Sequence, residues 1–171
     1  MTDQMTTPQP AVGDLAPDFT LPDDTGTPRR LAEQYGKWVI LYFYPTDDTP
    51  GCTTEACAFR DANDQIEERN AAVWGVSHLG VDSKAAFKAK YGLPFVLLAD
   101  EDHAVADSYG VWVEKNNYGK KYMGIARATF LVDPDGKIAR TWPKVRSEGH
   151  AEEVLAALDE ERTARSELQT A

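Results

Sequence analysis

The sequence predicts a single α/β domain with a central, mostly parallel β-sheet, an antiparallel edge and helices on both faces. Short apolar runs rich in strand formers alternate with helical patterns, as in βαβ units whose strands are parallel. Near the end of the chain, two strand patterns flank a tight turn sequence, which indicates an antiparallel pair. The 171 residues suit one domain, and 42% of them are hydrophobic, which excludes a disordered chain.

The predicted strands are short and apolar. Residues 38–44 (WVILYFY) form a nearly continuous apolar run, so we expect a central buried strand. Further strands are expected over 72–77, 94–98, 129–132 and 137–142, the last two joined by an Asp-Pro-Asp-Gly turn. A short hairpin over 19–31 with an Asp- and Gly-containing turn precedes them, and the polar segment 113–122 is expected to be a loop.

Helical patterns lie between these runs. They are expected over residues 50–69, 82–91, 104–109 and 149–165. We therefore expect a flexible N-terminal tail over 1–13, one domain over 14–165 and a C-terminal tail over 166–171.

Charge and hydropathy limit the partners and the location. With 18 basic and 28 acidic residues the net charge is −10, so nucleic acid and anionic membranes are not expected partners. Residues 1–13 show no basic segment followed by an apolar run, and no stretch has the roughly 18 apolar residues of a membrane span. A cytoplasmic protein is expected.

Only two cysteines occur, Cys52 and Cys57, too few for a disulfide framework. In a reducing compartment such cysteines are catalytic, metal-binding or inert. The three histidines, His78, His103 and His150, are far apart in the sequence, so no metal site is expected. His103 and His150 are expected on the surface.

The segment after residues 38–44 carries the chemistry. Thr49 followed by Pro50 is typical of an N-cap and the first helical position. Cys52 then lies in the first helical turn, where unpaired N–H groups and the helix dipole favour a thiolate. A more acidic thiol alone gives only about a tenfold gain in nucleophile, so other groups must hold the electrophile.

The spacing Pro45-x3-Thr49-x2-Cys52 resembles the peroxiredoxin active-site motif. The longer segment YFYPTDDTPGCTTEACAFRD is similar to that of the bacterioferritin-comigratory, or peroxiredoxin Q, class, and the similarity continues through GLPFVLLAD and GIARATFLVDPDGKI. It covers roughly residues 12–160. The resemblance implies a thioredoxin-like fold, a monomer, and a reaction that needs neither a metal nor an organic cofactor.

The resemblance also implies a role for each motif residue. Cys52 would be the nucleophile that attacks hydrogen peroxide and organic hydroperoxides and becomes a sulfenic acid. Thr49 would hydrogen-bond the peroxide, Pro45 would shield the pocket, and Arg127 would hold thiolate and peroxide. Cys57 would form a disulfide with Cys52, and thioredoxin would restore both thiols.

Helix geometry places a demand on that disulfide. Two residues five apart in an ideal helix have Cα atoms about 8.6 Å apart, and disulfides rarely tolerate more than about 7 Å. The start of the helix must therefore unwind in each cycle. Gly51, Thr53 and Thr54 are weak helix formers, which lowers the free energy needed for unwinding.

Other interpretations stay open at this stage. Thr49 alone could be an N-cap, Cys57 a buried core residue, and Arg127 the partner of any acid, while Glu55 is expected to be an exposed first-turn acid. Where the class commonly has Ser-His before a Phe, this chain has Ala85-Ala86-Phe87, so no catalytic role is expected on that helix. The alternative function is a redox sensor or a thiol–disulfide exchange protein that uses the same cysteine pair, although exchange enzymes usually carry C-x2-C.

Overall fold

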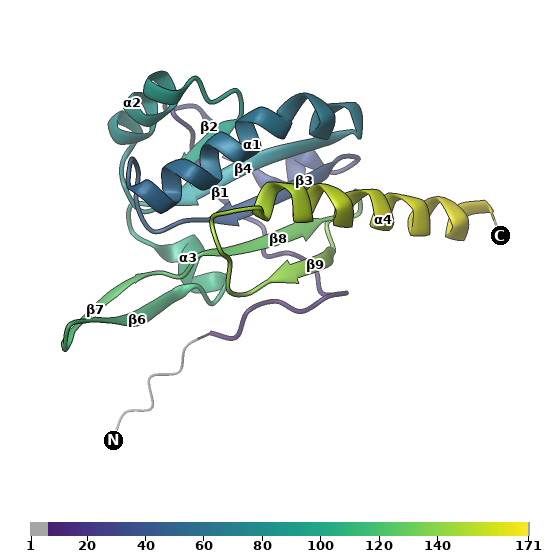
Figure 1. Ribbon diagram of the computed structural model, residues 1–171. Coiled ribbons are helices and arrows are strands. Elements are labelled where there is room, and N and C mark those ends of the chain that lie inside the picture. Colours follow the sequence, from purple (N-terminus) through teal and green to yellow (C-terminus); the bar gives the residue numbers. More distant parts are fainter. Residues whose placement is uncertain (1–6, 171) are drawn as a thin grey trace.

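The computed structural model describes residues 7–170, and these residues form the expected α/β architecture. The central sheet has the strand order β5-β4-β3-β8-β9 (Figure 1). Its strands are β3 (Trp38–Phe43), β4 (Ala71–Ser77), β5 (Val96–Ala99), β8 (Ala128–Val132) and β9 (Ile138–Trp142). All the strands predicted for this sheet are present, with ends that shift by two residues at most.

The mixed direction of the sheet is also as predicted. Strands β3, β4 and β5 are parallel, β8 is antiparallel to β3, and β9 is antiparallel to β8. In the parallel β3–β4 pair, Tyr42 lies opposite Gly75, and a Cβ on Gly75 would lie 2.8 Å from the Tyr42 ring. Glycine at that position therefore leaves room for the large ring.

Alternation along β3 divides the interior into two cores, one on each face of the sheet. Val39, Leu41 and Phe43 pack toward one face, and Ile40 and Tyr42 pack toward the other. The first core is closed by β1 (Thr20–Pro22), the 3₁₀ helix η1 (Leu31–Gln34) and α3 (Ala104–Ser108), while β2 (Pro28–Arg30) pairs with β1 outside it. The second is covered by α1 (Pro50–Glu68), α2 (Val81–Tyr91) and α4 (His150–Thr170), with α1 and α4 in contact (Figure 1).

The segment expected to be a loop over 113–122 is instead a β-hairpin, so that prediction was wrong. Strands β6 (Trp112–Asn117) and β7 (Lys120–Ile125) pair in antiparallel fashion and project from the body of the domain (Figure 1). Tyr118 and Gly119 both have positive φ, as tight hairpin turns require. Because most of the hairpin is solvent-exposed, its strands lack the apolar alternation that marks a half-buried strand.

Both ends of the domain are more ordered than the sequence indicated. The last helix continues to Thr170 rather than ending near residue 165. At the other end, the Gly13 N–H donates to the Ile138 carbonyl at 2.8 Å, and a Cβ on Gly110 would lie 2.4 Å from the Thr7 carbonyl oxygen. Residues 7–13 therefore lie against the domain, and residues 1–6 of the expected tail are outside the described part.

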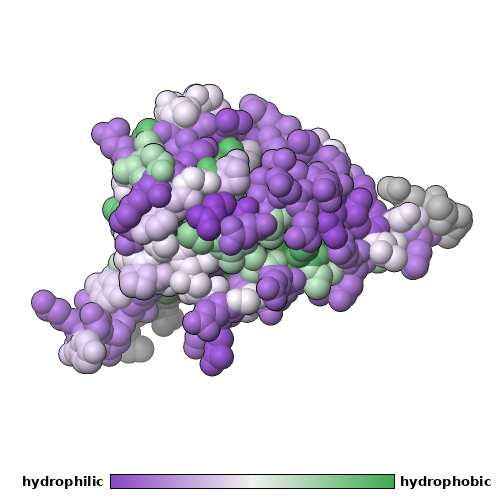
Figure 2. All heavy atoms as spheres, turned by 45° about the horizontal axis from the view of Figure 1, so that its top comes forward, coloured by the Kyte–Doolittle hydropathy of each residue, from purple (hydrophilic) through white to green (hydrophobic). Residues whose placement is uncertain are grey.

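The surface seen in Figure 2 is mainly hydrophilic, with small hydrophobic areas between hydrophilic side chains. Within residues 7–170, no helix is long and apolar enough to cross a membrane.

Candidate active site

Thr49 and Cys52 occupy the predicted positions at the start of α1. Thr49 is the N-cap residue with extended backbone, Pro50 follows at the first helical position, and Cys52 lies in the first turn. The Thr49 side chain caps no backbone N–H, and its hydroxyl makes only a long 3.5 Å contact with the Thr46 carbonyl. The hydroxyl of Thr49 therefore retains hydrogen-bonding capacity for a small polar ligand beside Cys52.

Arg127 lies against the sulfur of Cys52. Its Nη2 donates to the Cys52 Sγ at 3.4 Å. Cys52 itself is buried, with only 1% of its surface exposed to solvent. Strand pairing explains why Arg127 lies close to Cys52. Phe43 at the end of β3 lies opposite Ala128, the residue after Arg127, so Arg127 lies beside the loop that leads from β3 to Cys52. A Cβ on Gly51 would lie 3.0 Å from Arg127 Nη2, so glycine at that position leaves room for the guanidinium.

Glu55 is buried at this site, which corrects the expectation of an exposed first-turn acid. It is 1% exposed, and its Oε1 accepts a hydrogen bond from Arg127 Nη1 at 2.8 Å. The signal was present in the sequence, because Cys52, Glu55, Ala56 and Phe59 share one stripe of a helix. An acid in the first helical turn also complements the helix dipole, and that pattern alone favours an exposed position for Glu55.

The electrostatics of the site centre on the Arg127 guanidinium. Burial raises the pKa of Glu55 to about 7, and Arg127 opposes that rise. Burial also lowers the pKa of Arg127, but Glu55 and Cys52 together raise it above its ordinary value. Arg127 therefore stays cationic between a carboxyl group and a sulfur, where its charge stabilises any negative charge that develops on a bound oxygen.

Tyr42 forms the inner wall of the site. Its ring packs against those of Tyr44 and Phe59, with centroids 5.4 and 4.9 Å away. Burial, followed by the charges of Glu55 and Cys52, raises the pKa of Tyr42 well above its ordinary value, so the phenol stays neutral. Among the described residues, neither Tyr42 Oη nor Glu55 Oε2 has a hydrogen-bond partner.

Cys57 lies in the same helix as Cys52, and both are free thiols. The helix is continuous from Pro50 to Glu68, so the two Cα atoms are separated by the ideal-helix distance of about 8.6 Å. Cys57 is half-buried and does not reach the Cys52 sulfur. Direct contact between the sulfurs requires a change in the first turns of α1.

The histidines do not join this site. His150 was expected on the surface but is buried, because it opens α4 where that helix packs on Phe59 of α1. Its ring nitrogens contact Thr129 Oγ1 and Glu153 Oε1, each at 2.8 Å. His103 is partly exposed and stacks on Trp112 at 4.0 Å. Within residues 7–170, no group of three or more His, Cys, Asp or Glu side chains is placed to hold a metal ion.

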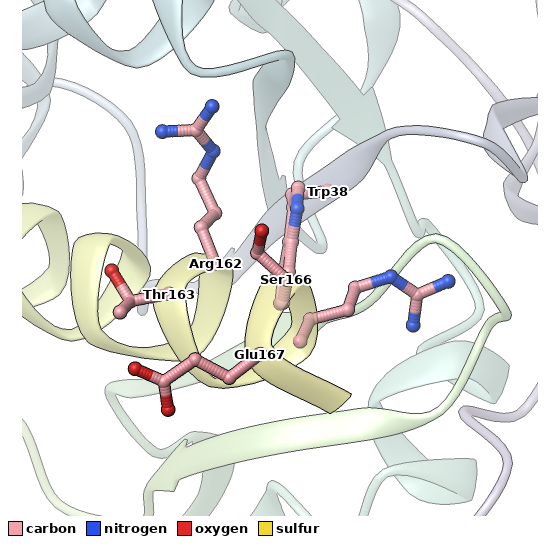
Figure 3. A pocket seen from close by; sticks show the side chains of 6 residues that line it. Trp38, Arg162, Thr163, Ser166 and Glu167 are labelled. Carbon is pink, nitrogen blue, oxygen red and sulfur yellow. The ribbon is translucent and has the colours of Figure 1, made fainter. Parts of the chain in front are cut away.

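Two surface hollows lie at opposite ends of the fold. One of about 410 Å³ lies between Trp38 and the end of α4, where Figure 3 shows the side chains of Arg162, Thr163, Ser166 and Glu167. Trp38 opens β3, so this hollow is at the far end of the strand from Pro45. A second hollow of about 500 Å³ borders the start of α1 and residues 145–148, and is therefore the one beside the Cys52 site.

Comparisons with known proteins agree with this arrangement. The AhpC/TSA family model matches residues 12–141. A putative peroxiredoxin bcp of Coxiella burnetii is 53% identical over 147 residues, which cover 86% of this chain and 97% of the relative. The peroxiredoxin Bcp of Bacillus subtilis is 46% identical over 147 residues, covering 86% of this chain and 94% of the relative.

Solved structures show the same likeness. A cysteine-to-serine mutant of Xylella fastidiosa PrxQ superposes with a TM-score of 0.85 at 37% identity, covering 90% of this chain and 98% of that one. Structures of the Xanthomonas campestris bacterioferritin comigratory protein, which concern its alkyl peroxide reduction activity, give a TM-score of 0.80 at 41% identity, covering 84% of this chain and 91% of that one.

The chain belongs to the AhpC/TSA family of thioredoxin-like folds. Within that family it is a peroxiredoxin of the Bcp, or peroxiredoxin Q, type, and so a thiol-dependent peroxidase that acts on hydroperoxides with a reductant.

Proposed function

We propose that Cys52 is the peroxidatic nucleophile and that Cys57 resolves it. The Cys52 thiolate attacks the terminal oxygen of hydrogen peroxide or an organic hydroperoxide. An S–O bond forms as the O–O bond breaks, and the departing hydroxide or alkoxide takes up a proton. The Cys57 thiolate then attacks the sulfenic sulfur, so that an S–S bond forms as the S–O bond breaks, and the departing hydroxide takes up a proton to give water. An external dithiol, such as thioredoxin, is oxidised as it restores both thiols.

One observation carries this proposal: the 3.4 Å contact between Arg127 Nη2 and Cys52 Sγ at a helix start. The guanidinium and the unpaired N–H groups of the first helical turn place positive charge beside a buried sulfur and beside the oxygen that it would attack. The hydroxyl of Thr49, whose hydrogen bond to the Thr46 carbonyl is long, is available to orient the peroxide, and Arg127 is available to stabilise the charge on the leaving oxygen. Pro45, half-buried between Tyr44 and the loop, would limit the access of water.

The state of the protein follows from the same chemistry. Both cysteines must return to thiols, which suits the reducing cytoplasm. The cysteine pair lies within one chain, so a monomer completes the cycle, and the acidic surface with a net charge of −10 disfavours nucleic acid as a partner. Light scattering coupled to size-exclusion chromatography checks the mass, and a dimer would contradict the proposed monomer.

The two cysteine roles are tested by a coupled assay with thioredoxin, thioredoxin reductase and NADPH. Cys52→Ser should remove all peroxide-dependent NADPH oxidation, because no other group supplies the nucleophile. Cys57→Ser should still consume one equivalent of peroxide, then stall as a sulfenic acid and over-oxidise readily. Sustained turnover by Cys52→Ser would refute the assignment.

The same assay separates the alternative function. A redox sensor would form the disulfide with peroxide but would turn over slowly with every dithiol tested. A thiol–disulfide exchange protein would reduce disulfide substrates at rates comparable with those for peroxide. Fast peroxide turnover together with slow disulfide exchange supports the peroxidase proposal.

A further inference from the structure

The loop between β3 and α1, residues 45–49, carries two consecutive carboxylates that both contact α2. This loop begins with Pro45 and ends with Thr49, so its shape sets where these two residues lie relative to Cys52. No sequence pattern connects this loop with α2, which lies more than 30 residues further along the chain.

The inner carboxylate, Asp47, is enclosed by donors. Its side chain is 3% exposed, and Lys84, which is fully buried, places Nζ 3.2 and 3.0 Å from its two oxygens. Ser83 Oγ donates to Oδ2 at 2.7 Å, and Tyr44 Oη donates to Oδ1 at 2.6 Å. Asp47 therefore accepts hydrogen bonds from three side chains, Tyr44 just after β3 and Ser83 and Lys84 of α2.

The ammonium group of Lys84 is satisfied as well. Besides the two Asp47 oxygens, its Nζ donates to Ser77 Oγ at the end of β4, and it lies 5.2 Å from the Tyr44 ring centroid. Burial lowers the pKa of Lys84, while the neighbouring Asp47 opposes that change. A buried polar network with every member paired is stiff, whereas removal of one partner leaves an isolated buried charge.

The outer carboxylate adds a weaker contact. Asp48 has a positive φ of 58° and accepts hydrogen bonds from Lys90 Nζ at 2.7 Å and Tyr91 Oη at 2.5 Å. These groups are exposed, so water and salt compete with them. The buried Asp47–Lys84 pair therefore supplies most of the attachment of the loop to α2.

We propose that Lys84 is a positioning residue for the peroxidase reaction: through Asp47 it fixes the loop that carries Pro45 and Thr49. The pair anchors this loop to α2 and β4, two elements that lie outside the first turns of α1, and only those first turns must rearrange when the disulfide forms. The peroxide-binding side of the pocket thus keeps its shape while the helix that bears both cysteines unwinds. This inference rests on the proposed role of Thr49 in orienting the peroxide.

The test compares two reactions of the same sulfur. In Lys84→Met, the second-order rate of Cys52 with hydrogen peroxide should fall by about 10- to 100-fold, because a misplaced loop misaligns the peroxide. Alkylation of Cys52 by iodoacetamide should change less than about threefold, because it needs no alignment by Thr49. General loss of folding would lower or raise both rates together. Lys88→Met is the matched control. Lys88 lies on the same helix as Lys84, and its partly exposed ion pair is with Asp24, so its replacement should leave both rates unchanged.

Coupling to Thr49 separates positioning from a general structural role. In a Thr49→Val background, Lys84→Met should cost little further peroxide rate, because the residue it positions is already missing. If Lys84→Met does not fold, Asp47→Asn combined with Lys84→Met leaves no unpaired buried charge and should show the same selective loss. An unchanged peroxide rate in a folded variant, or fully additive losses with Thr49→Val, would overturn the positioning role. Either result would leave the proposed role of Cys52 intact, because that role is tested separately by the loss of activity in Cys52→Ser.

Discussion

Arg127 meets two different groups with its two terminal nitrogens, Cys52 through Nη2 and Glu55 through Nη1. A guanidinium is planar, so the Glu55 contact also fixes the orientation of the nitrogen that faces the sulfur. Lysine offers no such fork and could not satisfy both partners with the same geometry. Glu55 thus acts on the sulfur through the arginine, at the cost of burying a carboxyl group.

Glu55→Gln should remove a pH-dependent loss of stability. The pKa of Glu55 is raised from 4.5 to about 7 in the folded protein, so the folded state holds this proton more tightly than the unfolded state. The contribution of Glu55 to stability is then fully present below pH 4.5 and is lost as the pH rises to about 7. Relative to the wild type, Glu55→Gln should gain up to about 3 kcal/mol in unfolding free energy across this range.

Urea unfolding of both proteins at several pH values between 4 and 8 checks this expectation. Above pH 7 the difference between variant and wild type should be constant. Parallel stability curves throughout would mean that Glu55 stays ionised in the fold and that Arg127 fully compensates its burial.

Single residues were predicted well where one local pattern decides their place, and less well where partners come from distant segments. The helix start alone places Thr49 and Cys52 correctly. The burial of Glu55 depends on its ion pair with Arg127, 72 positions later. The burial of Lys84 depends on its ion pair with Asp47, 37 positions earlier. No local pattern contains either pairing, although both residues lie on the apolar stripe of their helix.

At the scale of elements, α1 must be stable enough to place Cys52 and weak enough to release it. Thr53 and Thr54 occupy its first turns, and Thr54 Oγ1 bonds back to the Pro50 carbonyl at 3.0 Å. Threonine is a weak helix former because its branched side chain loses rotamer freedom against the preceding turn. The sequence at the helix start therefore lowers the free energy needed for local unwinding.

Replacing Thr53 and Thr54 with Ala should slow disulfide formation about fivefold, since two such changes strengthen the helix by about 1 kcal/mol. The attack on peroxide should be unchanged, because the helix is intact in that step. Stopped-flow tryptophan fluorescence after a single equivalent of peroxide separates the two phases.

Thr163→Ala in α4 is the matched control, because Thr163 Oγ1 makes the same type of back-bond, to Asp159 at 2.9 Å. That variant should leave both phases unchanged. Amide exchange should also be faster over residues 51–60 in the oxidised protein than in the reduced one. An oxidised protein that keeps this helix with the disulfide formed would contradict the unwinding step.

Helices and strands with a buried face are easier to predict from the sequence than exposed ones. Strands β3, β4, β5 and β8 follow from apolar runs, because both faces of the sheet are covered there, whereas the half-buried β9 follows from the tight turn that joins it to β8. The β6–β7 hairpin was taken for a loop because its strands are held by backbone pairing and a Tyr-Gly turn rather than by a buried face. Composition carries little information about such an exposed hairpin.

At the scale of the whole molecule, the two chain ends differ in their attachment to the domain. The buried face of α4 is formed by Ala151, Val154, Ala157 and Leu158, all before residue 165, whereas Leu168 is exposed. At the other end, residues 7–13 cover Gly110 and pair with the β9 strand through Gly13. The domain should therefore tolerate truncation at its C-terminus better than at its N-terminus.

A chain that ends at Arg165 should keep its unfolding free energy within about 0.5 kcal/mol of the full chain, because only an exposed helix end is lost. Its peroxide rate should be unchanged, since the removed segment borders the hollow at Trp38, at the opposite end of β3 from Pro45. A chain that begins at Asp14 should instead lose about 1–3 kcal/mol, because Ile138 loses a backbone partner and Gly110 loses its cover. Denaturant unfolding of the two truncated chains side by side tests the proposed domain limits of 14–165. Equal losses at both ends would show that the end of α4 stabilises the fold, and a neutral N-terminal truncation would show that residues 7–13 do not.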